Sequence, residues 1–132
     1  MIDHLPALIA RLEAATGPSR ELDCEIAEQA GWAEVGYRPK FVSPIGFPPH
    51  GKSVRCVPRY TASLDAALTL VPEDWKMQGQ IAWPGYDDGK FINDVRVELH
   101  HVVSSGGGPM VTALAKTIAI AICLAALKAR LA

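Results

Sequence analysis

The stretch MVTALAKTIAIAICLAALKARLA, residues 110–132, decides the fold. A helix drawn through it is apolar on most sides, and such a helix is buried on most sides. The loop SSGGGP, residues 104–109, precedes it. We therefore predict one long C-terminal helix that begins near Pro109 and around which the rest of the protein packs.

The side chains of this predicted helix form two ridges. The large ridge should pack on a sheet, whereas the small ridge allows a second helix to approach closely. The small ridge contains Ala113, Thr117, Ala121, Ala125 and Ala129, and the large ridge Ile120, Leu124, Leu127 and Leu131. The second helix belongs either to the N-terminal region or to another subunit. Ala121, Ala125 and Ala129 are therefore candidate interface residues for a homo-oligomer or a protein partner.

The sheet is predicted upstream of this helix, where the apolar period changes to two. Apolar residues alternate with polar ones from Trp75 to Trp83 and again over residues 91–99. The turn GYDDGK, residues 85–90, lies between them and has the composition of a hairpin turn. We expect an antiparallel pair of strands.

Three shorter helices are predicted before the sheet. The first has Leu5, Leu8, Ile9 and Leu12 on one face and ends at Gly17. The second begins at the N-cap Ser19 and ends at Gly31, so that the two form a helical hairpin. A third begins at the N-cap Ser63 and ends before Pro72.

Residues 36–63 have a different composition from the rest of the chain. They hold five of the ten prolines and five Lys or Arg residues, without a single Asp or Glu. We predict a long basic loop, interrupted only by a short strand near residues 53–57.

Together these elements predict a single α+β domain over residues 1–132. The expected architecture is an α-β-α sandwich, in which a small antiparallel sheet is flanked by the N-terminal helical hairpin and the long C-terminal helix. A chain of 132 residues is long enough to bury one hydrophobic core.

Composition and cysteine usage indicate an ordinary cytoplasmic protein. Three widely spaced cysteines, Cys24, Cys56 and Cys123, fit neither a disulfide framework nor a zinc-knuckle pattern. The N-terminus lacks the features of a signal peptide, and the uncharged run from Thr117 to Leu127 is too short to span a membrane. The net charge of −1 creates no overall attraction to nucleic acid.

Three sequence blocks resemble a family of small phage and prophage proteins of unassigned function. They are RELDCEIAEQAGW at 20–32, YTASLDAALTLVPEDW at 60–75 and KTIAIAICLAALKAR at 116–130, and they cover about a third of the chain. The resemblance implies a phage origin, hence the cytoplasm of a bacterial host cell, and an α-β-α sandwich, and it brings no catalytic residues. Family members open the last helix with Thr-Pro, whereas this chain has Thr117-Ile118, which favours the earlier helix start near Pro109.

Two segments are candidates for binding a small anionic ligand. Arg59, Tyr60 and Thr61 precede the helix that Ser63 caps, where a guanidinium and backbone amides are able to hold an anion. Gly106, Gly107 and Gly108 lie in a loop of the kind that holds phosphates, although a P-loop or dinucleotide signature is missing. For both segments a purely structural role is the favoured interpretation.

The basic segment offers a third candidate, a nucleic-acid surface over residues 36–60. Aromatic residues Tyr37, Phe41, Phe47 and Tyr60 are interleaved with its basic side chains, as in proteins that bind single strands. The low net charge argues against nucleic acid as the partner, and a solvated loop is the favoured interpretation.

The sequence indicates neither catalysis nor metal binding. His100 and His101 are adjacent and would point to opposite faces of a strand, so they do not suit one metal ion. No cofactor signature and no nucleophile elbow is present. We therefore expect a non-enzymatic binding or interaction protein, with a sponge for a phosphorylated or nucleotide ligand as one alternative and a nucleic-acid binder as another.

Overall fold

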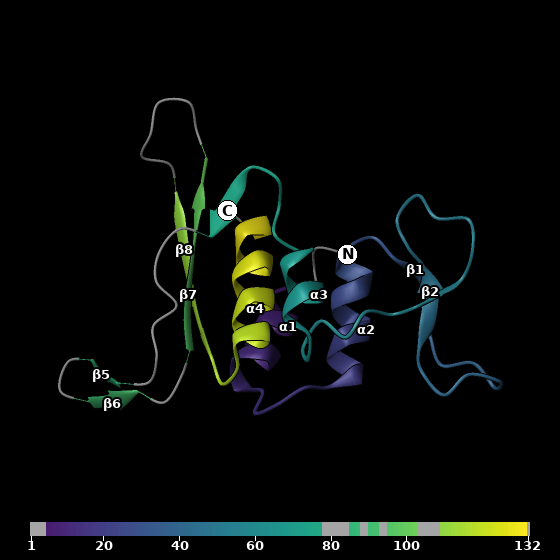
Figure 1. The fold of residues 1–132 in the computed structure, drawn as a ribbon, viewed down its shortest axis with the longest axis horizontal. Coiled ribbons are helices and arrows are strands. Elements are labelled where there is room, and N and C mark those ends of the chain that lie inside the picture. The colour runs from purple at the N-terminus through teal and green to yellow at the C-terminus, as the bar shows by residue number, and fades with distance from the viewer. Residues whose placement is uncertain (1–4, 78–84, 88–89, 93–94, 103–108, 132) are drawn as a thin grey trace.

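The computed structural model describes residues 5–77, 85–87, 90–92, 95–102 and 109–131. Figure 1 shows a group of helices with the larger sheet on one side and a smaller sheet on the other. Four helices and two three-stranded antiparallel sheets confirm the predicted α+β class, and a short two-stranded hairpin completes the described elements.

The three N-terminal helices form where local signals predict them. The α1 helix covers Leu5–Ala14, α2 covers Arg20–Gln29 and α3 covers Leu64–Leu68. Ser19 caps α2 by accepting a hydrogen bond from the Leu22 amide at 3.3 Å, and Ser63 caps α3 in the same way through Ala66. Both caps were predicted, because a hydroxyl at this position satisfies an amide that the helix leaves without a partner.

The larger sheet has the strand order β4-β7-β8, formed by Trp75–Met77, Val95–His101 and Met110–Ala115. The predicted antiparallel pairing is confirmed, with Trp75 opposite His101 and Met77 opposite Leu99. The predicted turn corresponds to a separate hairpin of β5 (Gly85–Asp87) and β6 (Lys90–Ile92). The remainder of the first predicted strand, residues 78–83, lies outside the described residues.

The predicted start of the C-terminal helix was wrong. Residues 110–115 form β8, which pairs with β7 from Val95↔Ala115 to His100↔Met110, and α4 covers only Ile118–Leu131. Thr117 marks the change, because its hydroxyl accepts from the Ile120 amide at 3.2 Å as an N-cap does. Alanine is the best helix former, but helix propensity is worth less than about 1 kcal/mol per residue and is overridden here by the backbone hydrogen bonds that β7 offers.

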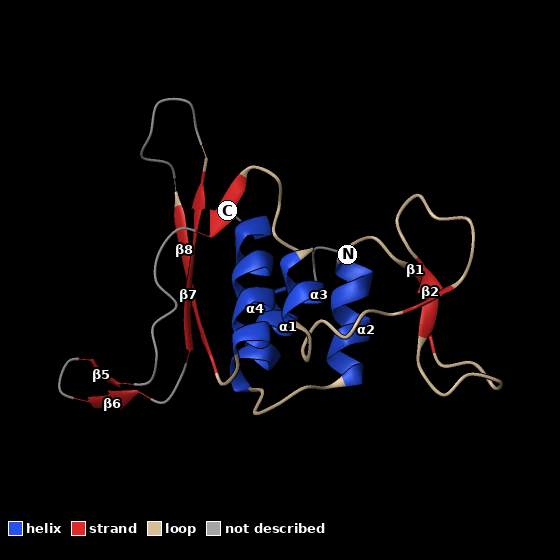
Figure 2. Cartoon of the chain, in the orientation of Figure 1, coloured by secondary structure: helices blue, strands red, loops and turns tan. Residues whose placement is uncertain are grey.

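The core is centred on α4, which packs against the sheet and also against α1 and α3 (Figure 2). Nine consecutive residues of α4, from Ala119 to Leu127, are buried, and so is Ala129. On the β7 strand Val95, Val97 and Leu99 are buried, whereas Arg96 on the opposite face is exposed. The buried face of the sheet is therefore the one that α4 covers.

The prediction of a long irregular loop after α2 was also wrong in part. Three short strands form the smaller sheet there, namely β1 (Ala33–Gly36), β2 (Ile45–Phe47) and β3 (Arg55–Cys56). Only the last was expected. Their register, with Ala33 opposite Phe47 and Ile45 opposite Cys56, joins residues that are about ten or more positions apart, which no local pattern reveals. We call residues 33–60 the basic lobe and the remainder the helical body.

Candidate functional site

Two of the three residues in the predicted Arg59-Tyr60-Thr61 site are part of the core. Tyr60 is 3% exposed and Thr61 is fully buried, whereas Arg59 is exposed. The Cys123 thiol on α4 donates to the Tyr60 carbonyl at 3.2 Å. The segment therefore packs against the helical body, and no ligand reaches Tyr60 or Thr61 in this arrangement.

Thr61 takes part in a buried hydrogen-bond cluster at the start of α2. Its amide and its hydroxyl both donate to Asp23 Oδ1, at 2.8 and 2.7 Å, and its hydroxyl accepts from the Ser19 amide at 2.9 Å. Asp23 is only 1% exposed. Because a buried carboxylate is costly unless it is fully hydrogen-bonded, these contacts explain why Thr61 is needed at this position.

Arg20 completes this cluster and attaches the end of the basic lobe to α2. Its guanidinium donates to Asp23 Oδ2 at 2.7 Å, to the Val57 carbonyl at 2.8 Å and to the Pro58 carbonyl at 3.2 Å. A guanidinium suits this task because its donors lie in a rigid fork. We call Arg20, Asp23 and Thr61 the junction cluster.

Tyr60 makes a second attachment between the two regions. Burial raises the pKa of its phenol, and a hydrogen bond with the Trp32 side chain acts in the opposite direction. Trp32 follows α2 and leads into β1, so the phenol and the indole link the helical body to the root of the basic lobe. Both attachments are structural and leave Arg59 as the exposed member of the predicted site.

The other predicted site residues lie elsewhere. Gly106, Gly107 and Gly108 are outside the described residues. Ala121 and Ala125 are fully buried and Ala129 is 4% exposed. These three alanines face the chain's own core, so they do not form a surface on which a second subunit could pack.

The basic lobe differs strongly in charge from the helical body. Five Lys or Arg residues and one Glu give the lobe a net charge of +4. The rest of the chain has eight Lys or Arg and thirteen Asp or Glu, a net charge of −5, which accounts for the overall value of −1. The near-neutral total thus conceals two regions of opposite sign. Positive charge on one lobe provides a local attraction for anions that the total does not show.

A hollow of about 540 Å³ lies at the root of this lobe. Its lining includes the Trp32 indole, three basic side chains and a thiol, namely His50, Lys52, Arg55 and Cys56. Lys52, Arg55 and Cys56 are exposed, and Trp32 is half-buried. An aromatic plane beside several cations suits a ligand that combines a ring with phosphate or carboxylate groups. This hollow is the candidate functional site.

One wall of the hollow is a tight turn with an unusual backbone. The Gly51 amide donates to the Pro48 carbonyl at 2.9 Å, and His50 has a φ of 63°. A turn with proline at its second position and positive φ at its third normally has glycine or asparagine at the third. A histidine is less common at this position, where a residue with a Cβ carries a conformational cost. Trp32, His50 and Cys56 were not predicted from the sequence as site residues.

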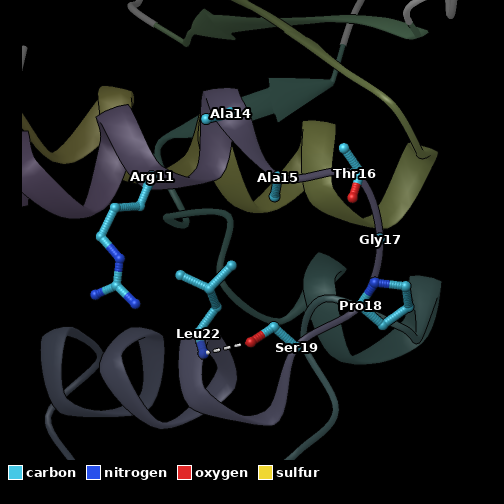
Figure 3. Close-up of a pocket in the computed structure, with 8 residues that line it drawn as sticks. All are labelled: Arg11, Ala14, Ala15, Thr16, Gly17, Pro18, Ser19 and Leu22. Carbon is cyan, nitrogen blue, oxygen red and sulfur yellow. Dashed lines mark hydrogen bonds between the residues drawn. The ribbon is translucent and has the colours of Figure 1, made fainter.

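A second hollow, of about 450 Å³, lies between α1 and α2 and is shown in Figure 3. Of the described residues that line it, Arg11 alone is charged. The Arg11 guanidinium forms an ion pair with Glu25 and lies 3.5 Å from Glu21. Since its charge is already neutralised by α2, this hollow offers little to an anionic ligand.

Within the described residues, no group of three or more His, Cys, Asp or Glu side chains is placed to hold a metal ion. None of the described helices has the length and hydrophobicity that crossing a bilayer requires.

The chain matches no family model, no curated protein and no solved structure. The resemblance to phage and prophage proteins therefore stays a prediction.

Proposed function

We propose that the protein is a non-enzymatic binding protein that holds a small phosphorylated or nucleotide-like ligand in the hollow of the basic lobe. The observation that carries this proposal is the convergence of His50, Lys52 and Arg55 beside the Trp32 indole. Lys52 and Arg55 would hold the phosphate groups, and the indole would contact the ring of the ligand.

The charge distribution supports this proposal. Arg38, Lys40 and Arg59 lie in the same lobe as the hollow, and Glu34 is its only acidic residue. An anion that approaches the lobe meets a region of net positive charge, whereas the helical body, with its net negative charge, repels it. If the resemblance to phage proteins holds, a sponge that sequesters a host signalling nucleotide is a role that such a site would serve.

The test is equilibrium binding of adenosine 5′-monophosphate and of inorganic phosphate, measured by titration calorimetry. Replacing Lys52 and Arg55 together by glutamine should weaken nucleotide binding by roughly tenfold or more, because each lost charge-assisted hydrogen bond contributes about 1.5–3 kcal/mol. The matched control replaces Lys76 and Arg96, which are exposed on the larger sheet. Equal losses in both double variants, or no nucleotide binding by the unmodified protein, would refute the site.

The thiol in the lining gives a second readout. Cys56 is exposed and lines the hollow, so a bound nucleotide should slow its alkylation by N-ethylmaleimide. Cys123 is buried and serves as the internal reference. Native mass spectrometry of freshly purified protein would show in addition whether a small molecule is retained and how many subunits are present.

A second candidate function, binding of single-stranded nucleic acid, rests on a different observation. Tyr37 and Phe41, in the segment between β1 and β2, are 63% and 51% exposed and lie among the basic residues of the lobe. Exposed aromatic residues beside cations are able to stack on bases. Such binding would weaken steeply as the salt concentration rises, whereas a flat dependence would exclude this candidate.

A further inference from the structure

A cleft of about 700 Å³ lies outside the basic lobe, where β4, β7 and the last turn of α4 converge. Its volume falls in the range of roughly 300–1,000 Å³ that is typical of small-molecule sites. The residues that matter for its chemistry are Asp74, Trp75, His101, Pro109, Ala129 and Arg130. None of them contributes to the hollow described above.

The wall formed by β4 and β7 is held in place by several contacts. The His101 amide donates to the Pro109 carbonyl at 2.9 Å, and the Val102 amide donates to the Asp74 carbonyl at 2.7 Å. The His101 Nε2 atom lies 2.9 Å from Asp74 Oδ2. The imidazole also packs edge-on against the Trp75 indole, with ring centroids 5.2 Å apart. The carboxylate and the indole are therefore positioned before any ligand arrives.

Two opposite charges border this cleft without pairing with each other. The Asp74 side chain is 62% exposed and is bonded to His101 through Oδ2, and none of the described residues bonds to its Oδ1. Arg130 is exposed, and among the described residues it forms no ion pair. Apolar side chains also line the cleft, namely Trp75 and Ala129, which are 7% and 4% exposed. Arg130 lies in the last turn of α4, where a positive charge interacts favourably with the helix dipole. This interaction does not depend on the cleft.

We propose that this cleft binds a small zwitterion of the amino-acid class with an apolar side chain. The ammonium group would donate to Asp74, the carboxylate would accept from the Arg130 guanidinium, and the side chain would rest on Trp75. His101 would act as a positioning residue that orients the Asp74 carboxylate. Because the cleft presents both Asp74 and Arg130, a ligand that carries an ammonium and a carboxylate group should bind more tightly than one that carries only one of them.

This site is independent of the proposed function of the basic lobe. That lobe has one acidic residue and suits anions, whereas the cleft presents one acid and one base. Failure of nucleotide binding would therefore leave the cleft untouched, and failure at the cleft would not affect the lobe.

The test compares three probes by titration calorimetry on the intact protein: L-leucine, N-acetyl-L-leucine and L-leucinamide. Leucine should bind roughly tenfold or more tightly than either derivative, because each derivative lacks one charge. Arg130→Gln should remove the preference for leucine over leucinamide. Asp74→Asn should remove the preference for leucine over N-acetyl-leucine.

The controls use neighbouring residues of the same charge. Lys76→Gln and Glu73→Gln alter exposed residues next to the site and should leave all three affinities unchanged. Thermal unfolding of each variant separates lost binding from lost folding. Equal binding of the three probes, no binding of leucine, or variants that fold normally and keep the full preference would each overturn the proposal.

Discussion

The helical body and the basic lobe are stabilised in different ways. In the body α4 has ten buried residues, and α1, α3 and the larger sheet pack around it. The lobe consists of strands of four, three and two residues. On these strands only Ile45 and Gly46 are buried, and the lobe exposes Tyr37, Phe41, Val42 and Val54. The difference indicates that the body residues serve folding, whereas many lobe residues remain available for binding.

The junction cluster holds the basic lobe against the helical body. We therefore expect the largest change in the free energy of unfolding from a substitution in this cluster. Asp23→Ala would remove the carboxylate to which the Thr61 amide, the Thr61 hydroxyl and the Arg20 guanidinium all donate. Removal of one member of a buried charged pair typically costs about 3–5 kcal/mol. Urea denaturation should show a loss of this size in the free energy of unfolding.

The matched control is Glu28→Ala, which removes an exposed carboxylate from the same helix. It should change the free energy of unfolding by less than about 0.5 kcal/mol. If Asp23→Ala were equally mild, the cluster would not hold the two regions together.

High pH should lower the free energy of unfolding, because the Cys123 thiol is buried in the helical body. Burial raises the pKa of Cys123 from its ordinary 9.0 to about 12. The folded state therefore retains a proton that the unfolded state loses above about pH 9. The stability that this group contributes is complete below pH 9 and is lost as the pH rises toward 12, by an amount on the order of a few kcal/mol.

Burial also raises the pKa of Tyr60 and Cys24, so both add to the same trend. Cys123→Ala should flatten the decline of the free energy of unfolding between pH 9 and 12. Cys56→Ala, at an exposed position of the lobe, should leave the decline unchanged. An identical pH profile for the two variants would contradict the assignment.

The smallest effect on stability is expected at the outer surface of the lobe. Replacing Tyr37 and Phe41 by serine should change the free energy of unfolding by less than about 0.5 kcal/mol per residue, because both side chains are largely exposed. The same variant should bind adenosine 5′-monophosphate normally, because neither residue lines the hollow. Weaker binding of a ten-nucleotide deoxythymidine strand would favour the nucleic-acid function instead.

Prediction from the sequence succeeded where the decisive contacts are local. Ser19 and Ser63 cap their helices through amides three residues away, so a short window contains the whole signal. It failed where the partner is distant in the chain. Ala113 and Ala115 occur in a helix-like composition, but their strand pairs with Val97 and Val95.

The candidate sites show the same division. The basic composition of residues 36–63 drew attention to the right segment, because charge can be counted without a structure. The aromatic member of the hollow, Trp32, lies outside that segment and joins Lys52 and Arg55 only through the folding of the small sheet. Likewise Asp74 and His101 are 27 positions apart and meet through the pairing of β4 with β7.

The sequence by itself determined the α+β class, the capped helices, the burial of α4 and the basic character of one segment. These features follow from hydrophobic period, capping residues and charge, which act over a few residues. Only the tertiary structure decided that residues 110–115 form a strand, that Tyr60 and Thr61 are buried, and that the alanines of α4 face the core. Each of these depends on hydrogen bonds or packing between distant segments, whose free energy outweighs the weaker local preferences.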